Sequence, residues 1–600
     1  MAKNRQLTEQ DDSEDEVVDE IVDDEKREDL PEEEPDARVE EPVEGGAEPG
    51  AEGRLKRFGR WVKHHKKVAI PAAFVLVLAV LAAAPVTRYA LAGTVVKQRF
   101  AVKIVDSETK KPVSGVHITL AGEDAVTDNE GRAAVKARVG NAKLTIEKKY
   151  YEAVDRTVLV PILKQKETLE VAVKATGRQV PVTVVNKITR KPLAEATIKV
   201  LDTKTETDTD GKAILVLPAD RATVKATLSH SGFNDVDITV TINTKQISAN
   251  NFALTPEGKI YFMSNASGKL DVVQSNLDGT DRKVVLAGTG KEDKNDTILL
   301  ASRDWKYLAL KSRRDGGEYD KLFLIETANG SVTTMDEGDA QFGIYGWSDH
   351  RFVYEVNRVK VGSFDAHKYA IKSYNAPAKK ITTLDQSQAQ KGKPATKYYA
   401  AESFGQVFIV NGKLIYTVSW DGSLSTPRPT VIRTVAVDGT DKQDLKSFNG
   451  YDYSPYISSR FYAFGEIYFG IWNTNEQKTN FFEYEDGKIT ATDIDDTEFN
   501  RSYPNYFISP SAKRTFWTES RDGKNVFFTG NESAEDEKTI ATLKDFATYG
   551  WFTDDYVLVS RDDSELYIMS SEGLQDSKTP LKVTNYYRPD YRIPGYGGGY

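Results

Sequence analysis

Apolar and polar residues alternate along most of the chain in short runs separated by turn residues. Runs such as Ala101–Val105, Val116–Leu120 and Lys143–Glu147 are separated by segments that contain Gly, Asp, Asn or Pro. A period of two in short runs is typical of half-buried β-strands. From about residue 256 onward the runs become rich in aromatic residues and show no helical period. The pattern therefore predicts a mainly β protein.

One segment breaks this pattern. Residues 68–87 form twenty consecutive residues without a charge. At about 1.5 Å per residue, a helix of this length matches the roughly 30 Å hydrocarbon core of a bilayer. The segment therefore predicts one transmembrane helix, with these anchoring residues: Val68, Phe74, Leu76, Leu78, Leu81 and Thr87.

A basic segment, residues 54–67, directly precedes the predicted helix. It contains no acid and seven basic residues: Arg54, Lys56, Arg57, Arg60, Lys63, Lys66 and Lys67. The fifteen residues after Thr87 contain only Arg88, Lys97 and Arg99. By the positive-inside rule, the N-terminal region lies in the cytoplasm and everything after residue 88 is extracytoplasmic. The basic residues are then expected to contact anionic lipid headgroups of the cell membrane.

Two alternatives compete with a single-pass signal-anchor. A cleaved signal peptide would use Ala90–Ala92 as its cleavage site, but its n-region would be 67 residues long, whereas such regions are short. The basic segment could instead bind nucleic acid. Its position beside an apolar segment is explained more simply by headgroup contact, so no nucleic-acid partner is expected.

Residues 1–53 have a composition typical of disorder. They contain 22 Asp and Glu, 5 Lys and Arg, and no aromatic residue, for a net charge of −17. Such a segment cannot bury enough apolar surface to offset chain entropy. Val17, Val18, Ile21 and Val22 have helical spacing and could contact a cytoplasmic partner, although scattered aliphatic residues in a solvated tail explain them better. The formal charge of −10 thus divides into this acidic tail, a basic segment of +7 and a neutral remainder.

An internal repeat follows the predicted membrane segment, at a lag of 80 residues. Six residues of the stretch 100–135 recur in one ungapped register: Thr109, Pro112, Thr127, Asp128, Gly131 and Ala133 return as Thr189, Pro192, Thr207, Asp208, Gly211 and Ala213. Short alternating strands with turns every 8 to 12 residues indicate a small antiparallel sandwich. The repeat predicts two β-sandwich modules, at 97–176 and 178–254.

The repeated motif, a strand followed by [DN]xxTxKP[VL], a second strand and TDxxG[RK]A, resembles the carboxypeptidase regulatory-like domain. The resemblance implies a transthyretin-like sandwich that serves as a stalk or adhesion unit. Within it, Glu206, Asp208, Asp210 and Gly211 resemble the start of a calcium loop. In an EF-hand register, however, Leu217 would replace the bidentate Glu, and no helices flank the loop. A hairpin turn without a metal is therefore expected.

The C-terminal region, 256–590, contains phrases that recur in order. Leu277–Asp281 returns as Val437–Asp441, Tyr345–Trp347 as Tyr549–Trp551, and SRDWK at 302 as SPSAK at 509. The strand clusters form seven units of about 35 to 48 residues, the size of a four-stranded propeller blade. They lie near 258–290, 299–337, 343–384, 401–448, 455–495, 506–543 and 548–587. A β-propeller of about seven blades is predicted, followed by a Gly/Tyr-rich tail at 591–600.

The phrases "strand, LDGTD, strand" and "SpdgKxxxF" resemble TolB-like and dipeptidyl-peptidase-type propellers, although Pro510 lacks the following Asp-Gly. The strand near Ile247–Leu254 is expected to close the propeller by pairing with the last blade. In peptidases that carry such a propeller, an α/β-hydrolase domain performs the chemistry. Neither its Gly-x-Ser-x-Gly elbow nor a stretch of alternating strands and helices occurs here.

Composition limits the chemistry further. Without cysteine there is no disulfide, thiol nucleophile or thiolate metal site. The six histidines show no metal-ligand spacing, and Ser107–Lys110 fits Ser-x-x-Lys only across a β-turn. The sequence does not exclude a catalytic site built on carboxylates, because glycosidase and lyase sites combine acids that are distant in sequence. The acids at predicted propeller turns are Asp304, Asp315, Asp349, Asp421, Asp522 and Asp554.

Two functions remain after these exclusions. The first is a membrane-anchored, extracytoplasmic binding or scaffold protein whose propeller recognises a protein or glycan, with no catalytic residues and no cofactor. The second is an envelope glycan-active hydrolase or lyase with a carboxylate pair on the propeller face. Tryptophans could line the ligand face or pack between blades: Trp347, Trp420, Trp472, Trp517 and Trp551. The whole arrangement resembles bacterial single-pass envelope proteins.

Overall fold

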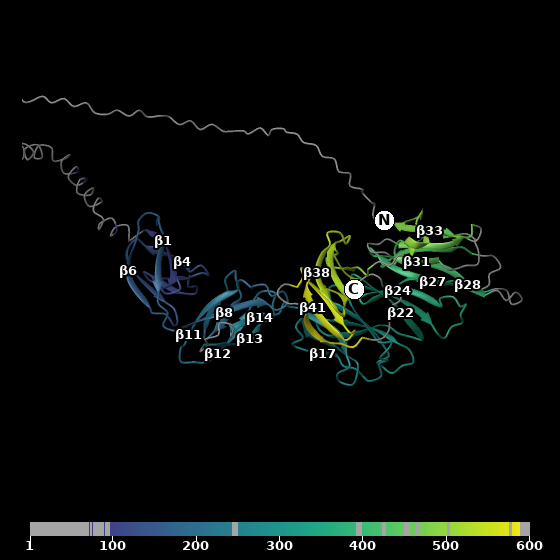
Figure 1. The fold of residues 1–600 in the computed structure, drawn as a ribbon, viewed down its shortest axis with the longest axis horizontal. Helices are drawn as coiled ribbons and strands as arrows, with labels where there is room; N and C mark the ends of the chain where they lie inside the picture. Colours follow the sequence, from purple (N-terminus) through teal and green to yellow (C-terminus); the bar gives the residue numbers. More distant parts are fainter. Residues whose placement is uncertain are drawn as a thin grey trace, which may run out of the picture. The chain divides into compact units, whose positions relative to one another are not determined.

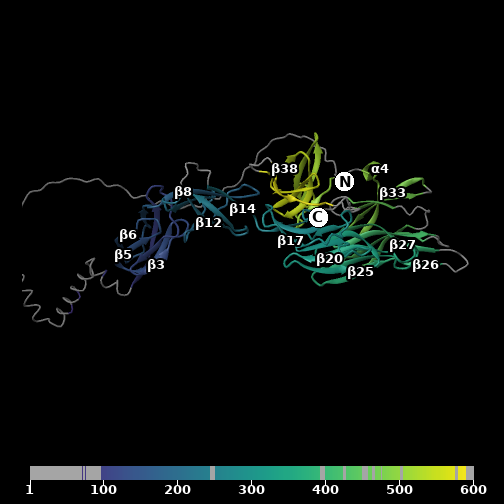
Figure 2. The same ribbon diagram turned by 90° about the horizontal axis from the view of Figure 1, so that it is seen from below.

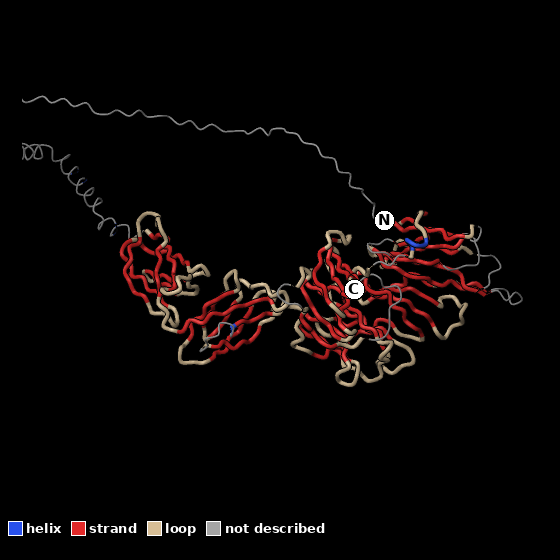
Figure 3. Tube along the Cα trace, in the orientation of Figure 1, coloured by secondary structure: helices blue, strands red, loops and turns tan. Residues whose placement is uncertain are grey.

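A computed structural model of the chain consists almost entirely of β-strands (Figure 3). It describes residues 71, 75, 89, 96–242, 250–391, 399–422, 428–448, 457–461, 467–473, 476–500, 504–574 and 579–588. The mainly β prediction is confirmed.

The N-terminal predictions fall outside the described residues. These are the acidic tail 1–53, the basic segment 54–67 and, except for Pro71 and Val75, the anchor 68–87. The C-terminal tail 591–600 also lies outside them. Within the described part of the chain, no helix has the length and apolar character needed to cross a bilayer. The membrane anchor therefore stays a prediction.

The first module, at the N-terminal end of the described strands, is a sandwich of two sheets (Figure 1). One sheet has the order β4-β1-β7 and the other β3-β2-β5-β6. Inward-facing residues of both sheets, such as Val102 and Ile118, form one buried core. The strands are β1 (Lys97–Asp106), β2 (His117–Leu120), β3 (Glu123–Val126), β4 (Arg132–Arg138), β5 (Gly140–Glu147), β6 (Val154–Val160) and β7 (Leu169–Val173).

The second module repeats this topology, with sheets β11-β8-β14 and β10-β9-β12-β13. The expectation that the strand near Ile247–Leu254 closes the propeller is wrong. That strand, β14, pairs in parallel with β8, as β7 does with β1 in the first module, so it completes the sandwich. The strands are β8 (Arg178–Asn186), β9 (Thr197–Val200), β10 (Thr203–Glu206), β11 (Lys212–Leu217), β12 (Thr223–Ser229), β13 (Val236–Thr241) and β14 (Asn251–Leu254).

The repeated residues have the same structural role in both modules. The Thr127 hydroxyl accepts from the Val116 amide at 2.9 Å and donates to the Val113 carbonyl at 2.8 Å. Thr207 makes the equivalent pair of bonds in the second module. A Cβ on Gly131 or Gly211 would lie 2.4 Å from a backbone carbonyl, and both residues have positive φ. The motif is conserved between the copies because it satisfies buried backbone groups at one turn.

Seven successive antiparallel sheets make up the rest of the described chain. The first has three strands, the fourth has five, and the others have four. The first four sheets contain β15 (Lys259–Ser264), β16 (Asp271–Asn276), β17 (Lys283–Leu286); β18 (Ile298–Ala301), β19 (Tyr307–Ser312), β20 (Lys321–Glu326), β21 (Ser331–Asp336); β22 (Ala340–Ser348), β23 (Arg351–Arg358), β24 (Tyr369–Asn375), β25 (Lys380–Gln386); and β26 (Ala389–Lys391), β27 (Tyr399–Val410), β28 (Lys413–Gly422), β29 (Thr430–Ala436), β30 (Gln443–Phe448).

The last three sheets follow the same pattern, with a short helix α4 (Asp496–Phe499) after the fifth. The side chain of Asp495 caps this helix by accepting from the Glu498 amide. The strands are β31 (Ile457–Phe461), β32 (Ile467–Asn473), β33 (Lys478–Glu485), β34 (Lys488–Thr492); β35 (Phe507–Ile508), β36 (Arg514–Arg521), β37 (Lys524–Asn531), β38 (Lys538–Leu543); and β39 (Phe546–Thr553), β40 (Tyr556–Arg561), β41 (Glu565–Ser570), β42 (Leu581–Asn585).

The recurrent phrases occupy equivalent positions in these sheets. Trp347 and Trp551 both follow a Gly of positive φ at a β-bulge, and each indole donates to a carbonyl of the preceding sheet. The acceptors are Leu300 O at 3.2 Å and Phe507 O at 2.8 Å. The two tryptophans therefore pack between blades, and the phrase marks the first strand of a blade.

Shared apolar cores connect neighbouring sheets. They join the first five sheets in succession and the sixth to the seventh. Successive sheets lie side by side in Figure 2, from β17 through β20 and β25 to β27. Another core joins the last sheet to the first, with Phe552 and Ile568 packed against Ile260 and Phe262. The array is a β-propeller whose ends meet by packing; within the described residues, no strand pairs the last sheet with the first.

Candidate functional site

One end of the propeller sheets, here called the BC end, gathers the loops best placed to hold a ligand. In an antiparallel meander, the loop between the second and third strands and the connection to the next sheet lie at the same end. Residues at the ends of β19 and β32, the second strands of their sheets, therefore belong to it. Residues at the end of β28 also belong to it, because β26 is an additional strand and β28 is the second of the four strands that match the other sheets. Loops positioned by a rigid scaffold are where binding residues concentrate.

A carboxylate pair lies at the BC end of the second sheet, within one network of charges. Lys311 Nζ lies 2.6 Å from Asp296 Oδ1 and 3.6 Å from Asp320 Oδ2. Arg313 reaches the same two carboxylates at 3.4 and 3.3 Å. The Asp320 and Lys311 side chains are only 5% and 6% exposed.

Burial and neighbouring charge separate the pKa values of the two acids. Burial, together with the hydrogen bond to Asp296, raises the pKa of Asp320 to about 6 against the opposing charges of Lys311 and Arg313. Burial also acts to raise the pKa of Asp296, but the hydrogen bond from Lys311 and the nearby positive charges outweigh it and hold that pKa below its ordinary value. Two like charges this close favour one shared proton. The pair thus has the electrostatics of an acid and base, although only the Asp320 side chain is nearly inaccessible and that of Asp296 is 26% exposed.

Aromatic and cationic side chains at the same end are more accessible. Trp472, near the end of β32, is 43% exposed. Trp420 holds the matching position near the end of β28 in the neighbouring sheet, and Arg428 lies 4.5 Å from the centre of its ring. Lys360 lies 6.0 Å from the ring of Tyr319. Exposed aromatic residues with Arg are the composition that distinguishes binding surfaces.

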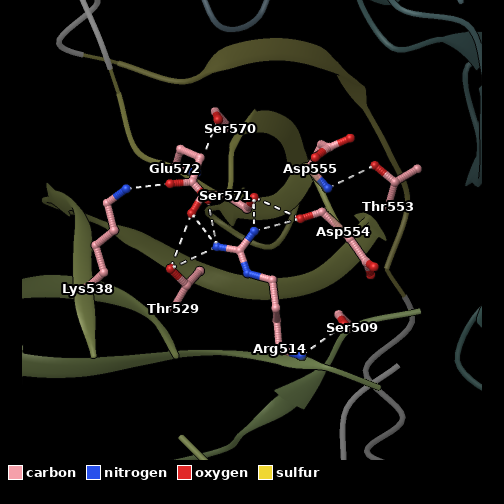
Figure 4. Close-up of polar contacts among 10 residues, drawn as sticks. All are labelled: Ser509, Arg514, Thr529, Lys538, Thr553, Asp554, Asp555, Ser570, Ser571 and Glu572. Atoms are coloured by element: carbon pink, nitrogen blue, oxygen red, sulfur yellow. Dashed lines mark hydrogen bonds and ion pairs between the residues drawn. The ribbon is translucent and has the colours of Figure 1, made fainter. Parts of the chain in front are cut away.

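At the opposite end, Arg514 connects the sixth and seventh sheets (Figure 4). Its guanidinium donates to Asp554 O at 3.0 Å and Ser571 Oγ at 2.8 Å, and pairs with Glu572 at 3.1 Å. Lys538 reaches the same Glu572 at 2.5 Å. Every group in this network has a partner within the chain, which indicates a structural link between blades.

The six acids predicted at propeller turns do not converge. The described contacts join none of them to another of the six. Asp304 accepts from Ser302 Oγ and His350 Nε2, both at 2.8 Å, and Asp315 pairs with Lys321. Asp554 accepts from the Ser511 amide, Asp349 and Asp522 hold left-handed turns, and Asp421 is exposed at the end of β28.

Sequence reasoning missed Asp296, Lys311, Arg313 and Asp320. Lys311 offered a signal, because it interrupts the apolar run of β19 at a position that the alternation places inside. Among the described residues, no cluster of three or more His, Asp or Glu side chains is arranged to hold a metal ion. The loop containing Asp208 is a hairpin: its carboxylate accepts from the Asp210 and Lys212 amides.

Comparisons with known proteins give low similarity throughout. No protein-family model matches the sequence, and no curated protein matches it. The β-propeller domain of the Trilobed protease from Pyrococcus furiosus is 10% identical, with a TM-score of 0.30, over 62% of this chain and 96% of that one. TolB from Acinetobacter baumannii is 11% identical, with a TM-score of 0.23, over 58% and 74%. An oligogalacturonate lyase from Vibrio parahaemolyticus is 11% identical, with a TM-score of 0.29, over 56% and 87%.

Proposed function

We propose that this protein is a membrane-anchored, extracytoplasmic binding or scaffold protein, and that the BC end of its propeller is the recognition surface. The partner is an extracytoplasmic protein or glycan. The two sandwiches act as the stalk between the anchor and the propeller.

The accessible tryptophan at the BC end supports this proposal most directly. Trp472 exposes 43% of its surface, and Trp420 with Arg428 occupies the matching place on the adjacent sheet. An exposed indole is costly to leave in water, and burying it against a partner is favourable by about 2 kcal/mol or more. Both protein anchors and sugar rings pack on such side chains.

The carboxylate pair favours catalysis less than its pKa values alone suggest. A general acid and base must reach the substrate within hydrogen-bond distance. Asp320 is 5% exposed, and Lys311 and Arg313 already contact both carboxylates. These contacts support a structural role, so binding is the preferred function.

Site-specific photocrosslinking in intact cells tests the recognition surface. A benzophenone side chain at position 472 is expected to capture one discrete protein or glycan. The control carries the same group at Val332, an exposed residue of the outer strand β21. Equal capture at both positions, or none at 472, would contradict a recognition role for the BC end.

Protease added to intact cells tests the topology. An extracytoplasmic propeller is expected to be cleaved from outside, within residues 256–600. Protection of that segment would show that the proposed orientation is wrong. Recovery of the segment in culture supernatant, with a new N-terminus near Gly93, would establish a cleaved signal peptide instead.

A further inference from the structure

A cleft of about 300 Å³ lies where the two sandwiches meet. Its walls come from the turns after β1 and β5 in the first module and from β10 and β11 in the second. Contacts on either side hold the modules together. Gln179 Nε2 donates to Asp106 Oδ2 at 3.1 Å, and Lys149 Nζ donates to Leu201 O at 3.0 Å. The volume is at the lower end of the range typical of small-molecule sites.

The acids of this cleft are already satisfied by the chain. Asp106 accepts from the Glu108 and Thr109 amides as well as from Gln179. Glu206 accepts from Asn129 and pairs with Lys204, while the backbone amides of a hairpin turn hold Asp208. These carboxylates therefore offer little to a cationic ligand.

The acids of the cleft are satisfied by the chain, whereas the Lys148 ammonium lacks an oppositely charged partner among the described residues. Among the described residues its partners are the Ser114 carbonyl and the ring of Tyr151, whose centre lies 5.9 Å away. No described carboxylate pairs with it, although an ammonium has three donors to satisfy. Burial lowers the pKa of this lysine to about 8. The cleft thus contains a desolvated cation without a counter-charge, and such a group favours an anion.

Apolar groups line the cleft beside this cation. Val113, Ala213 and Val216 are buried residues of its wall, and the half-buried Tyr151 ring adds an aromatic surface. An inorganic anion would leave these surfaces and most of the volume unused. A compact organic carboxylate would place its charge against Lys148 and cover the apolar surfaces with its body.

We propose that the cleft between the two sandwiches binds a small organic carboxylate. Its carboxylate accepts from Lys148, and its body packs against Tyr151, Val113 and Val216. This site is separate from the BC end of the propeller, so it stands or fails independently of the recognition surface.

Binding of benzoate to the full-length chain, followed by ligand-observed NMR, tests the proposal. Benzoate is expected to bind saturably, and benzamide, which has the same shape without the charge, about tenfold more weakly. Lys148→Met is expected to weaken benzoate about tenfold. The control Lys225→Met, which removes an exposed ammonium of the second module outside the cleft lining, should leave the affinity within about twofold. An absence of saturable benzoate binding, an equal loss in both variants, or equal affinity for benzamide would overturn the proposal.

Two further measurements keep the test informative if Lys148→Met does not fold. On the unaltered chain, benzoate affinity is expected to fall about tenfold between pH about 7 and about 9, as the Lys148 ammonium loses its proton. The other charged groups facing the cleft are the satisfied acids Asp106, Glu206 and Asp208 and the exposed Lys111, Lys149 and Lys212. A pH-independent affinity would overturn the assignment to Lys148. Inorganic phosphate that bound as tightly as benzoate would overturn the organic character of the ligand.

Discussion

Two junctions can be compared: the one between the two sandwich modules, and the one between the second module and the propeller. Both are built on equivalent residues, but the first is polar and the second is closely packed. Asp106 of the first module and Asn186 of the second occupy the same turn, 80 residues apart, and each accepts from the two amides that follow it closely. Asp106 also accepts from Gln179 of the second module, whereas Asn186 donates to Tyr556 Oη of the last propeller sheet at 3.1 Å. One conserved turn therefore serves both junctions.

The residues beside that turn determine the difference. Ser107 and Glu108 of the first module become Lys187 and Ile188 in the second. Ile188 joins the core shared by the first and last propeller sheets, and Lys187 pairs with the nearly buried Asp278 at 2.7 Å. The first junction instead remains polar and encloses the cleft. A repeat can thus keep its fold while two substitutions convert an open contact into a packed one.

The largest effect is expected from Gly279→Ala, beside the packed junction, where the first propeller sheet meets the last. A Cβ there would lie 2.1 Å from Val583 O, and the residue has positive φ. Backbone clash and strain together are expected to cost about 3–5 kcal/mol of unfolding free energy. Gly487→Ala is the control, because this hairpin glycine also has positive φ but no atom within 4 Å of a Cβ. It should cost about 1–2 kcal/mol; equal costs in chemical denaturation would refute tight packing at Gly279.

Asp278→Asn is expected to cost about 2–3 kcal/mol at neutral pH, because it leaves the Lys187 ammonium without its counter-charge. Burial acts to raise the pKa of Asp278, but hydrogen bonds from Lys187, Thr280 and Thr255 outweigh it and lower the pKa to about 2. A depressed carboxyl pKa stabilises the fold above the unfolded value of 3.8. The cost of the substitution should therefore shrink as pH falls from about 4 towards about 2.

The equivalent hairpin of the fourth sheet provides the control for Asp278. Asp438 is exposed and accepts from Thr440. Asp438→Asn is expected to leave the unfolding midpoint close to that of the unaltered chain, because solvent screens an exposed carboxylate. If thermal unfolding showed the same loss for both substitutions, the junction pair would not be the source of stability.

At the polar junction, Gly177→Ala is expected to cost about 1–2 kcal/mol. A Cβ would lie 2.7 Å from Leu217 O of the second module and 3.1 Å from Tyr150 Cβ of the first, so the modules must separate slightly. Hydrogen exchange should then increase at the Thr176 and Gly177 amides, which both donate to Tyr150 O. Gly317→Ala, where the nearest atom is 3.7 Å away, should change nothing. Unaltered exchange in Gly177→Ala would argue against close contact at this junction.

The smallest perturbation uses no substitution. Trace acetylation across a pH series is expected to show half-maximal reactivity of Lys148 near pH about 8, the value to which burial lowers its pKa. Lys379 is the internal control, because the hydrogen bond to Glu326 raises its pKa. Peptide mass spectrometry would follow both lysines. Coincident profiles would contradict the burial of Lys148 in the cleft.

Much of the fold was predictable because it depends on local sequence periodicity. Alternating runs gave the strands, the 80-residue lag gave the repeated module, and the Tyr-Gly-Trp phrases marked equivalent blade positions. The strand Asn251–Leu254 was placed wrongly, since an apolar run does not specify its partner. It pairs with β8 and completes the three-stranded sheet of the second sandwich, as β7 completes that of the first by pairing with β1.

The candidate sites were harder to predict. In the sequence, Lys148 is an ordinary turn lysine. It lines a cleft only because the second module, 30 or more residues further along the chain, packs beside it. Asp296 and Asp320 likewise acquire separated pKa values because a sheet brings them together around Lys311.

The strand content, the repeat, the blade units and the turn chemistry follow from the order of the amino acids, because backbone hydrogen bonding and side-chain alternation are local properties. Which surfaces are filled and which remain hollow depends on tertiary packing. Burial and desolvation depend on what packs against a residue, and residues distant in the chain provide that packing. For this reason Asp106 and Asn186, alike in sequence context, face a polar cleft in one module and a packed junction in the other.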